Sequence, residues 1–435
     1  MSSKQQTGDV IEENKQALVP KLRFPEFREA GGWKYIPLNR LAIRAKQKNR
    51  DEKIHRVLTN SAEFGVVDQR DFFDKDIATQ GKLEGYVVVE LGSYVYNPRI
   101  SSIAPVGPIS KNKVGTGVMS PLYTVFKFKD ERNDFYEHFF KTTGWHNYMR
   151  QASSTGARHD RMAISSDDFM AMPLPVSSAG EQQKIADCIS SMDELIAAQG
   201  RKVDALKIHK KGLMQLLFPR EGETQPRLRF PEFQNTGEWQ TLPLAALADK
   251  IMVGIASAAT HAYRESGVPM LRNQNIKEGK IDDSSLLFID PVYEAAHKNK
   301  RLRAGDVITV RTGYPGLSAV VPDRYNNAQC FTSLITRPKK SVLDADFLCA
   351  LINSEIGKRF ILGAEAGGAQ KNVNAGALEA LPVYLPEIPE QQRLATCLSS
   401  LDALITAETQ KHEALKTHKK GLMQQLFPSA EVVEA

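Results

Sequence analysis

The residues Glu181–Pro219 read EQQKIADCISSMDELIAAQGRKVDALKIHKKGLMQLLFP, and Glu390–Pro428 read EQQRLATCLSSLDALITAETQKHEALKTHKKGLMQQLFP. The two stretches align without a gap, at an offset of 390 − 181 = 209 residues. Both begin with Glu-Gln-Gln, and both contain His-Lys-Lys-Gly-Leu-Met-Gln near their ends. The chain therefore carries one long segment twice, and the rest of the sequence is arranged around the two copies.

Apolar residues recur in both copies at alternating steps of four and three, which is the 3.5-residue period of helices that pack along each other. The predicted helix–helix seam consists of Ile185, Ile189, Met192, Ile196, Val203, Leu206, Leu213 and Leu217 in the first copy and of Leu394, Leu398, Leu401, Ile405, Leu415, Leu422 and Leu426 in the second. Polar residues interrupt the seam at Gln199 and Glu408, the same position of the repeat, and we expect this pair to set the register. We predict that the two helices are each other's partners.

A second repeated element precedes each long helix. Pro20–Phe27 reads PKLRFPEF and Pro226–Phe233 reads PRLRFPEF, at an offset of 226 − 20 = 206, and a tryptophan follows each, at Trp33 and Trp239. The segments between these openings and the helices are largely dissimilar. This pattern indicates a tandem duplication in which the opening segments and long helices stayed similar while the segments between them diverged in sequence and, we infer, in function.

The composition is that of an ordinary globular protein. Of the 435 residues 42% are hydrophobic and 25% are charged, and the formal net charge of +6 is compatible with nucleic acid without requiring it. The sequence contains no apolar run of membrane-spanning length and its first residues lack an apolar signal core, so we expect a cytoplasmic protein. The four cysteines form no Cys-x-x-Cys pair and are predicted to be buried free thiols: Cys188, Cys330, Cys349 and Cys397.

We predict an α+β fold in which two mixed α/β domains are separated by two long antiparallel coiled-coil helices, related by a pseudo-twofold internal repeat. The predicted boundaries are a flexible N-terminal arm 1–19, a first domain 20–180, a first long helix 181–219, a linker and second domain 220–389, a second long helix 390–428 and a C-terminal tail 429–435. The linker Arg220–Arg227 would occupy the place that the two termini occupy in the other half, so we expect the termini to lie close together.

Within the two domains, local patterns predict strands and helices. The stretches Tyr86–Tyr96 and Arg303–Arg311 have β-branched and aromatic residues beside glycine turns and are predicted strands. Phe135–Tyr148 and Ala345–Leu362 have helical spacing. Each domain closes on a proline-bounded strand, at Met172–Val176 and Leu381–Pro386. Ser178 followed by Glu181 forms a capping-box pattern at the first long helix.

Motifs for catalysis or metal binding do not emerge from the sequence. Asn97-Pro98-Arg99-Ile100 lacks the second proline and the aromatic residue of an amino-methyltransferase tetrapeptide, and no phosphate-binding Gly-x-x-x-x-Gly-Lys-Ser/Thr motif is present. The triplet Glu278-Gly-Lys280 resembles part of a nuclease motif but has no Pro-Asp upstream. The histidines have no zinc spacing. We therefore expect no catalytic residue, no metal and no cofactor in this chain.

The domains instead carry loops rich in side chains that can hydrogen-bond base edges or phosphates, such as arginine with guanine and Asn or Gln with adenine. The candidate DNA-binding residues are Asn97, Arg99, Lys111, Lys113, Ser153, Arg158, His159 and Arg161 in the first domain and Arg272, Asn273, Asn275, Arg311, Tyr314, Gln370, Lys371 and Asn372 in the second. The loops Ser153–Arg161 and Gly367–Asn372 both stand just before the closing strand, which makes them the strongest candidates.

The repeated Leu-Arg-Phe-Pro-Glu-Phe openings with their tryptophans, the Glu-Gln-Gln helix starts and the His-Lys-Lys-Gly-Leu-Met-Gln-x-Leu-Phe-Pro helix ends resemble the specificity (S) subunits of type I restriction–modification systems, the HsdS family. The resemblance covers essentially Leu22 to Pro428. It implies two target-recognition domains, each reading one half of a bipartite double-stranded DNA target. It also implies recruitment of two modification subunits, which carry S-adenosylmethionine and methylate adenine. Two restriction subunits that use ATP and Mg²⁺ can join such complexes.

The helix length is consistent with that implication. A helix of about 39 residues is about 58 Å long at 1.5 Å per residue, so paired helices can separate two domains by a distance comparable to one DNA turn, about 34–36 Å. We predict a discontinuous, asymmetric target with an unread spacer. The basic helix ends Lys207–Lys211 and Lys416–Lys420 would contact either the modification subunits or the DNA backbone.

An alternative from another class is a non-catalytic coiled-coil adaptor, whose domains bind proteins instead of DNA. Salt-dependent binding of DNA, and sequence-specific binding in the presence of a modification partner, would distinguish the two functions.

Overall fold

The computed structural model describes residues 18–72, 83–155, 160–220, 222–257, 259–363 and 372–428. The chain divides into two compact units. Unit 1 comprises residues 1–198 and 412–435, and unit 2 comprises residues 199–411. Both units mix helices and strands, in agreement with the predicted α+β class.

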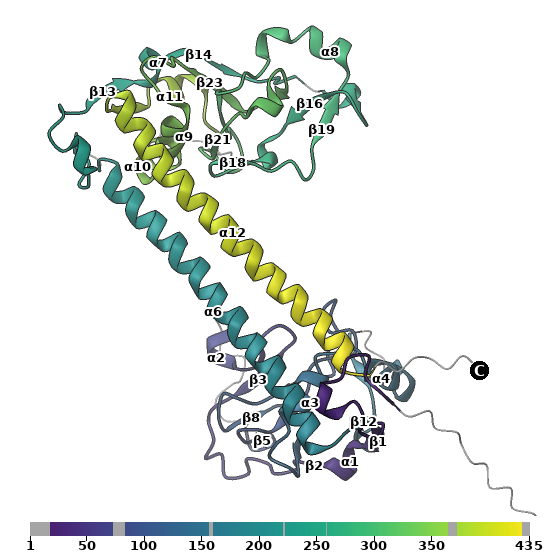
Figure 1. The fold of residues 1–435 in the computed structure, drawn as a ribbon. Helices are drawn as coiled ribbons and strands as arrows, with labels where there is room; N and C mark the ends of the chain where they lie inside the picture. The colour runs from purple at the N-terminus through teal and green to yellow at the C-terminus, as the bar shows by residue number, and fades with distance from the viewer. Residues whose placement is uncertain are drawn as a thin grey trace, which may run out of the picture. The chain divides into compact units, whose positions relative to one another are not determined.

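Two long helices dominate the picture in Figure 1: α6 (Ala179–Leu217) and α12 (Ile388–Leu426), each of 39 residues. Each begins and ends two residues earlier than predicted, because Phe218-Pro219 and Phe427-Pro428 lie outside the helices. Ser178 caps α6 by accepting the Glu181 N–H at 3.3 Å, as the capping pattern predicts. Both helices continue through their glycines, Gly212 and Gly421.

Unit 1 is built around a four-stranded antiparallel sheet of order β2-β9-β6-β7. Its strands are β1 (Lys34–Pro37), β2 (Ala42–Arg44), β3 (Leu58–Ser61), β4 (Gly65–Asp68), β5 (Val87–Val89), β6 (Tyr94–Tyr96), β7 (Ile109–Lys111), β8 (Gly117–Met119), β9 (Thr124–Phe128), β10 (Ser154–Thr155), β11 (Met162–Ala163) and β12 (Pro173–Val176). Its helices, besides part of α6 and of α12, are η1 (Pro25–Phe27), α1 (Leu38–Leu41), α2 (Gln69–Phe72), α3 (Asp134–Phe139), α4 (His146–Ala152) and α5 (Ser166–Met170).

Unit 2 repeats this sheet as β14-β23-β20-β21, again with every pair antiparallel. Its strands are β13 (Gln240–Pro243), β14 (Ala248–Val253), β15 (Tyr263–Arg264), β16 (Val268–Leu271), β17 (Ile276–Lys277), β18 (Lys280–Ile281), β19 (Leu287–Ile289), β20 (Val307–Thr309), β21 (Ser318–Val320), β22 (Gln329–Cys330), β23 (Leu334–Pro338) and β24 (Pro382–Leu385). Its helices, besides part of α6 and of α12, are η2 (Pro231–Phe233), α7 (Leu244–Leu247), η3 (Thr260–Ala262), η4 (Asn273–Asn275), α8 (Pro291–Ala295), η5 (Lys298–Lys300), η6 (Asp323–Tyr325), α9 (Ala345–Asn353), α10 (Glu355–Gly363) and α11 (Ala375–Glu379).

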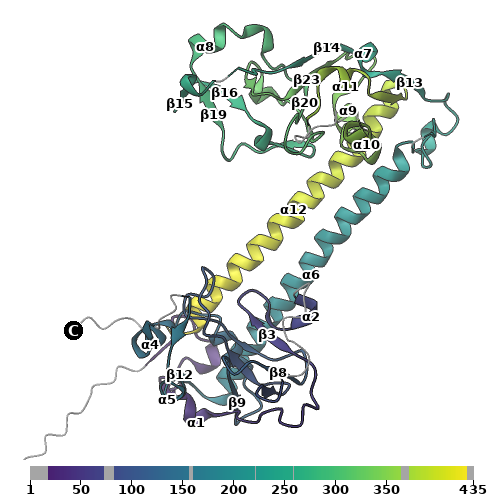
Figure 2. The same cartoon turned by 180° about the vertical axis from the view of Figure 1, so that it is seen from behind.

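The closing strands pair with the first strand of the same unit. β1 runs antiparallel to β12, with Lys34 opposite Val176, and β13 runs antiparallel to β24, with Gln240 opposite Leu385. Each strand pair returns the chain to the N-terminal end of a long helix, so the predicted proline-bounded strands deliver the chain to α6 and α12. In unit 2, α9, α10 and α11 lie around the N-terminal end of α12 (Figure 2).

The main core of each unit combines sheet, short helices and long-helix residues. In unit 1, Tyr94, Phe126 and Phe135 pack in one cluster with Ile185 of α6 and Leu426 of α12. In unit 2, the cluster contains Trp239, Phe347, Leu217 of α6 and Leu394 of α12. Burying these apolar side chains supplies the main favourable term for each unit. The largest core cluster of each unit therefore includes residues of both long helices, while smaller clusters lie within the domains alone.

Two predicted helices are each divided in the structure. Phe135–Tyr148 becomes α3 and α4, and Ala345–Leu362 becomes α9 and α10. Ser354 stands extended between α9 and α10, where its hydroxyl donates to the Leu351 carbonyl at 2.6 Å and accepts the Gly357 N–H at 3.4 Å. Serine competes with the helix for backbone partners in this way, which explains the break.

The four cysteines are free, but their burial differs from the prediction. Cys330 and Cys349 are buried, and burial raises the pKa of each thiol to about 12. Cys188 and Cys397 are half-buried, because they lie beside the seam and not within it. Among the described residues no helix is long and apolar enough to cross a membrane.

Candidate nucleic-acid interface

In each unit an ion pair with little exposure to solvent joins the opening segment to the N-terminal end of a long helix. In unit 1, Arg23 of the opening segment donates to both carboxylate oxygens of Glu181, at 2.6 and 2.8 Å, and Trp33 Nε1 donates to the same carboxylate at 3.1 Å. In unit 2, Arg229 donates to Glu390 at 2.7 Å twice, and Trp239 Nε1 donates at 3.3 Å. The repeated tryptophans and Glu-Gln-Gln starts thus meet in space.

The opening segments also touch the far ends of the long helices. The Leu22 N–H donates to the Gln425 carbonyl of α12 at 2.9 Å in unit 1, and the Leu228 N–H donates to the Leu216 carbonyl of α6 at 2.9 Å in unit 2. Residues 1–17 and 429–435 lie outside the described residues. The described residues near the two termini are therefore hydrogen-bonded neighbours, at the place that the linker occupies in unit 2.

The two long helices run antiparallel within each unit. In unit 1, Asp193 of α6 pairs with Lys419 of α12. In unit 2, Lys210 of α6 donates to Asp402 of α12 at 2.7 and 2.9 Å. Asp402 is the repeat equivalent of Asp193 (193 + 209), and Lys419 that of Lys210 (210 + 209), so the same ion pair is made twice with the helices exchanged.

The polar interruption of the seam is itself a contact. Gln199 Nε2 donates to the Glu408 carboxylate at 2.6 Å and to the Glu408 carbonyl at 3.0 Å. Lys202 pairs with the same carboxylate, and these two hydrogen bonds lower the pKa of Glu408. Of the predicted seam residues, Ile185, Ile189, Val203, Leu217, Leu394, Leu398 and Leu426 are buried, and Met192, Ile196, Leu206, Leu213, Leu401, Ile405, Leu415 and Leu422 are half-buried.

In unit 1, the chain after β6 pairs with the chain that enters β11. Arg99 and Arg161 face each other in an isolated antiparallel bridge. The Met162 N–H donates to the Pro98 carbonyl at 2.9 Å and the Ile100 N–H donates to the Asp160 carbonyl at 3.0 Å. Asn97 accepts the Arg99 N–H and donates to the Asn60 carbonyl at 2.9 Å, which fixes the loop. Arg99 is exposed and Arg161 half-buried.

In unit 2, the chain after β20 makes the corresponding contact. Thr312 and Asn372 form an isolated antiparallel bridge, and the Val373 N–H donates to the Arg311 carbonyl at 3.1 Å. Arg311 Nε donates to the Asn372 side chain at 2.9 Å, and Asn273 Nδ2 donates to the Thr312 hydroxyl at 2.9 Å. Tyr314, two residues further on, is 80% exposed.

These two bridges occupy the same position of the fold. Arg99 stands three residues after Tyr96, the last residue of β6, and Thr312 stands three residues after Thr309, the last residue of β20. In both units the residue after the bridge partner donates its N–H to the carbonyl just before the bridge. We call the two places the paired-loop sites. The backbone is equivalent, while the side chains are Arg99 and Arg161 in one unit and Thr312 and Asn372 in the other.

Several of the predicted DNA-binding residues lie away from the paired-loop sites or have hydrogen-bond partners within their own unit. Lys111 pairs with Asp134 at 2.7 Å and Lys113 with Glu137 at 2.8 Å, at the opposite end of the β6–β7 pair from Asn97. Ser153 is half-buried, with its hydroxyl 3.9 Å from Met162 Sδ. Arg272 donates to the Ser285 carbonyl at 2.7 Å. The remaining predictions, Arg158, His159, Gln370 and Lys371, lie outside the described residues.

The side chain of Asn275 is engaged inside unit 2, which does not favour the predicted contact with DNA. Asn275 is 1% exposed, accepts the Arg272 N–H at 2.9 Å and donates to the Asp282 carbonyl at 2.9 Å. A buried amide with both ends satisfied cannot reach a base edge. Thr312, which the sequence does not single out, lies in the bridge beside Arg311 and accepts a hydrogen bond from Asn273.

Groups that could bind a metal ion, with three or more His, Cys, Asp or Glu side chains, do not occur in the described part of the chain.

The buried histidine His138 contacts α6 through Ser190, with Nε2 and Oγ 3.0 Å apart. Burial lowers the pKa of His138 to about 4, so the imidazole is neutral at pH 7. Each unit thus presents a polar loop surface, and long-helix residues take part in its main core.

Residues 237–417 match the family model described as the type I restriction modification DNA specificity domain. The chain is similar to the HsdS family, the specificity subunits of type I restriction–modification systems, through this matched domain and through the relatives described next.

Individual relatives agree with this assignment. The "Type I restriction enzyme MjaVIII specificity subunit" of Methanocaldococcus jannaschii is 25% identical over 328 residues, which are 73% of this chain and 71% of that protein. The S subunit of a type I restriction–modification system from M. genitalium has a similar fold, with a TM-score of 0.54 at 12% identity over 95% of this chain and 100% of that one. A chain from a structure on complex assembly and conformational transition of the type I R-M system has a TM-score of 0.57 at 15% identity, over 91% of this chain and 98% of that one.

Proposed function

We propose that this specificity subunit reads a bipartite, asymmetric DNA target, one half-site with each unit, and that it is not itself an enzyme. The observation that carries the proposal is the pair of paired-loop sites, which have equivalent backbones and different side chains. Arg99 and Arg161 of unit 1 have side chains that can hydrogen-bond guanine, whereas the Asn372 amide of unit 2 can hydrogen-bond adenine. Recognition of two different half-sites requires different side chains, and the two units present different side chains on equivalent backbone.

We further propose that the chain recruits two modification subunits and, in some assemblies, two restriction subunits. S-adenosylmethionine would be bound by the modification subunits, and ATP with Mg²⁺ by the restriction subunits. Such a complex would work on DNA in the cytoplasm. The inner lysines, Lys210 and Lys419, are occupied by Asp402 and Asp193. Lys207, Lys211, Lys416 and Lys420 are exposed, so these lysines of the basic helix ends can meet a partner or a phosphate.

The experiment that tests the proposal is single-molecule methylation sequencing of host DNA with and without this chain. The expected result is methylated adenine in a motif of two short specified segments with an unspecified spacer. A single contiguous palindrome would contradict two separate reading units. Purified chain alone should not bind S-adenosylmethionine, and binding to random DNA should weaken steeply as salt increases.

The adaptor alternative makes a different prediction in the same assay. An adaptor whose domains bind proteins would leave the methylation pattern unchanged when the chain is removed. It would also show no sequence preference on DNA in the presence of a modification subunit.

A further inference from the structure

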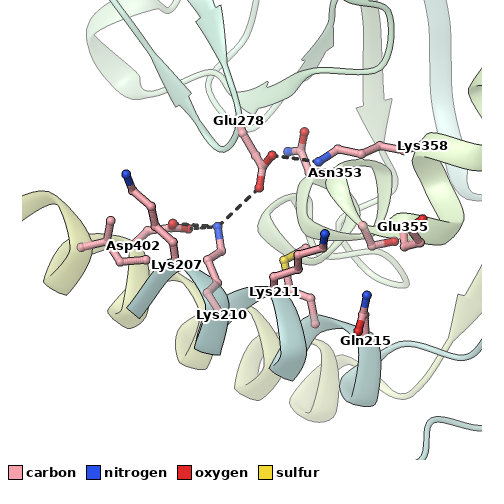
Figure 3. Close-up of a pocket in the computed structure, with 12 residues that line it drawn as sticks. Lys207, Lys210, Lys211, Gln215, Glu278, Asn353, Glu355, Lys358 and Asp402 are labelled. Carbon is pink, nitrogen blue, oxygen red and sulfur yellow. Dashed lines mark hydrogen bonds and ion pairs between the residues drawn. The ribbon is translucent and has the colours of Figure 1, made fainter. Parts of the chain in front are cut away.

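In unit 2, the turn between β17 and β18 reaches the long helices at the edge of a cavity of about 520 Å³ (Figure 3). Glu278 lies at the tip of this turn. Its carboxylate accepts a hydrogen bond from Lys358 of α10 at 2.9 Å and lies 3.7 Å from Lys210 Nζ of α6. Lys210 in turn is bonded to Asp402 of α12. One carboxylate thus connects a domain hairpin to both long helices and to α10.

The hairpin that carries Glu278 is tightly constructed. Gly279 has a φ of +72°, which glycine adopts without strain and which a two-residue turn needs here. The Gly279 N–H donates to the Ser318 carbonyl of β21 at 2.9 Å. Displacement of Glu278 would therefore be transmitted to the main sheet and would not be absorbed within the turn.

The same hairpin is continuous with the paired-loop site of unit 2. Asn275 joins η4 to the hairpin through the Asp282 carbonyl, and Asn273, within η4, donates to Thr312. The path from the helices to the reading loop therefore runs from Lys210 through Glu278 and η4 to Thr312, by contacts of stated geometry. The buried Asn275 has a structural place in this path.

Unit 1 attaches its domain to the helices differently. The repeat-equivalent ion pair, Asp193 with Lys419, lies beside His138, whose ring contacts Ser190 of α6. A neutral imidazole–hydroxyl contact there replaces the carboxylate contact of unit 2. An electrostatic attachment weakens with ionic strength more than a neutral one does, so the two units should respond differently to salt.

We propose that Glu278 is a positioning residue for DNA reading by unit 2: by bridging Lys210 and Lys358 it fixes the angle at which the paired-loop site stands on the long helices. This inference rests on the proposed function. The carboxylate does not contact DNA; it acts through the hairpin. The Glu278-Gly-Lys280 triplet is thereby explained without nuclease chemistry.

The test compares Glu278→Gln with Glu355→Gln in the complex with modification subunits. Glu355 lines the same cavity but pairs within α10, with Arg359 at 3.3 Å, so it is matched in charge and place. The measured quantity is the ratio of methylation rates on the target and on targets with the spacer lengthened or shortened by one base pair. We expect Glu278→Gln to reduce this ratio by about two- to fivefold, the range for a contact of this exposure, and Glu355→Gln to leave it unchanged.

A double-mutant cycle that combines Glu278→Gln with Lys210→Met tests whether Glu278 acts through Lys210. If Glu278 acts through Lys210, the double variant should have nearly the same ratio as the more affected single variant. Equal loss of rate on all targets, or an equal effect of Glu355→Gln, would show a general structural role and overturn the proposal. An unchanged ratio in Glu278→Gln would overturn it as well.

A second readout does not depend on DNA. Hydrogen exchange of the full chain should show faster exchange of the Asn275 and Gly279 amides in Glu278→Gln and normal exchange in Glu355→Gln, because both amides are bonded inside the linked segment. If the wild-type complex showed no sequence-specific methylation, the proposed function would fail, while this exchange result would still decide whether Glu278 holds the hairpin. Unchanged exchange would refute the positioning role by itself.

Discussion

Arg23 and Arg229 are the side chains on which the attachment of each opening segment depends. The side chain of Arg23 is 7% exposed and that of its partner Glu181 is 1% exposed. Such a pair is costly to desolvate, yet removing one partner leaves a buried charge with only its remaining hydrogen bonds. The Arg23–Glu181 pair therefore contributes more to the specific docking of the opening segment on α6 than to the net free energy of unfolding.

Arg23→Met is expected to lower the free energy of unfolding by about 3–5 kcal/mol, because Glu181 is left buried without its counter-charge. The double variant Arg23→Met with Glu181→Gln should recover much of this loss, since the uncompensated charge is gone. Chemical denaturation checks both. Arg132→Met, which removes an exposed pair with Asp130, is the control and should change little. A loss in the double variant equal to that in the single variant would contradict this explanation.

His138 gives unit 1 a pH dependence with a definite sign. Burial, with a further contribution from Lys141, lowers its pKa to about 4 from an ordinary value of 6.5, while Glu137 and Asp193 act in the opposite direction. The unfolded chain therefore binds a proton before the folded one does as the pH falls. This contribution to stability is complete above pH 6.5 and is lost between pH 6.5 and about 4.

The corresponding prediction is that His138→Gln flattens the decline in stability between pH 6.5 and 4, by up to about 3 kcal/mol. Urea unfolding at a series of pH values measures this. His418→Gln, which removes an exposed histidine from the same unit, should retain the wild-type decline. If both variants retained it, the acid sensitivity would belong to other groups.

At the scale of elements, the long helices followed directly from the sequence. Their 3.5-residue apolar period extends over many turns, and the second copy repeats it, so two independent stretches agreed. The short helices were predicted less well because Ser354 interrupts an apolar period that is otherwise continuous. The paired-loop sites were predictable only in part, since the bridge between Arg99 and Arg161 joins residues 62 positions apart. No local pattern encodes such a contact.

The glycines inside the long helices provide an element-scale prediction. An added Cβ at Gly212 or at Gly421 would meet nothing within 4 Å. Replacing either with alanine should therefore raise the free energy of unfolding by about 0.5–1 kcal/mol, through the lower helix propensity of glycine. Denaturant titration measures the change.

Gly107→Ala is the contrasting variant. Gly107 has a φ of +80°, and its added Cβ would lie 2.1 Å from the Asn97 carbonyl oxygen. This variant should destabilise unit 1 and disturb the loop that carries Arg99. Destabilisation by Gly212→Ala as large as that by Gly107→Ala would indicate that the helices require a bend at the glycine.

At the scale of the whole molecule, the two reading units should act independently. Arg161→Ala is expected to reduce discrimination in one half-site and Asn372→Ala in the other, each by about 1–3 kcal/mol if the side chain bonds a base. In the double variant the losses should add, because the sites share no partner. Methylation rates on targets substituted base by base measure this.

Variants of Arg158 and of Gln370 or Lys371 should follow the same division between the half-sites. Lys113→Ala, at the other end of the β6–β7 pair, is the control and should leave base preference unchanged. If Arg161→Ala weakened binding to all DNA equally and reduced the salt dependence by about one charge, Arg161 would be a phosphate contact and not a base reader.

The presence of Leu426 and Phe427 in the core of unit 1 has a consequence for protein synthesis. The ring of Phe427 lies 5.1 Å from that of Phe135, although the ribosome must add 428 − 198 = 230 residues after the first part of unit 1 before α12 is complete. At 5–20 residues per second this takes about 12–46 s. Unit 2 is continuous in sequence and can fold during that time, whereas the first domain emerges first and is completed last. A nascent chain that terminates before Leu426 and Phe427 would leave the aromatic core of unit 1 incomplete and exposed to solvent.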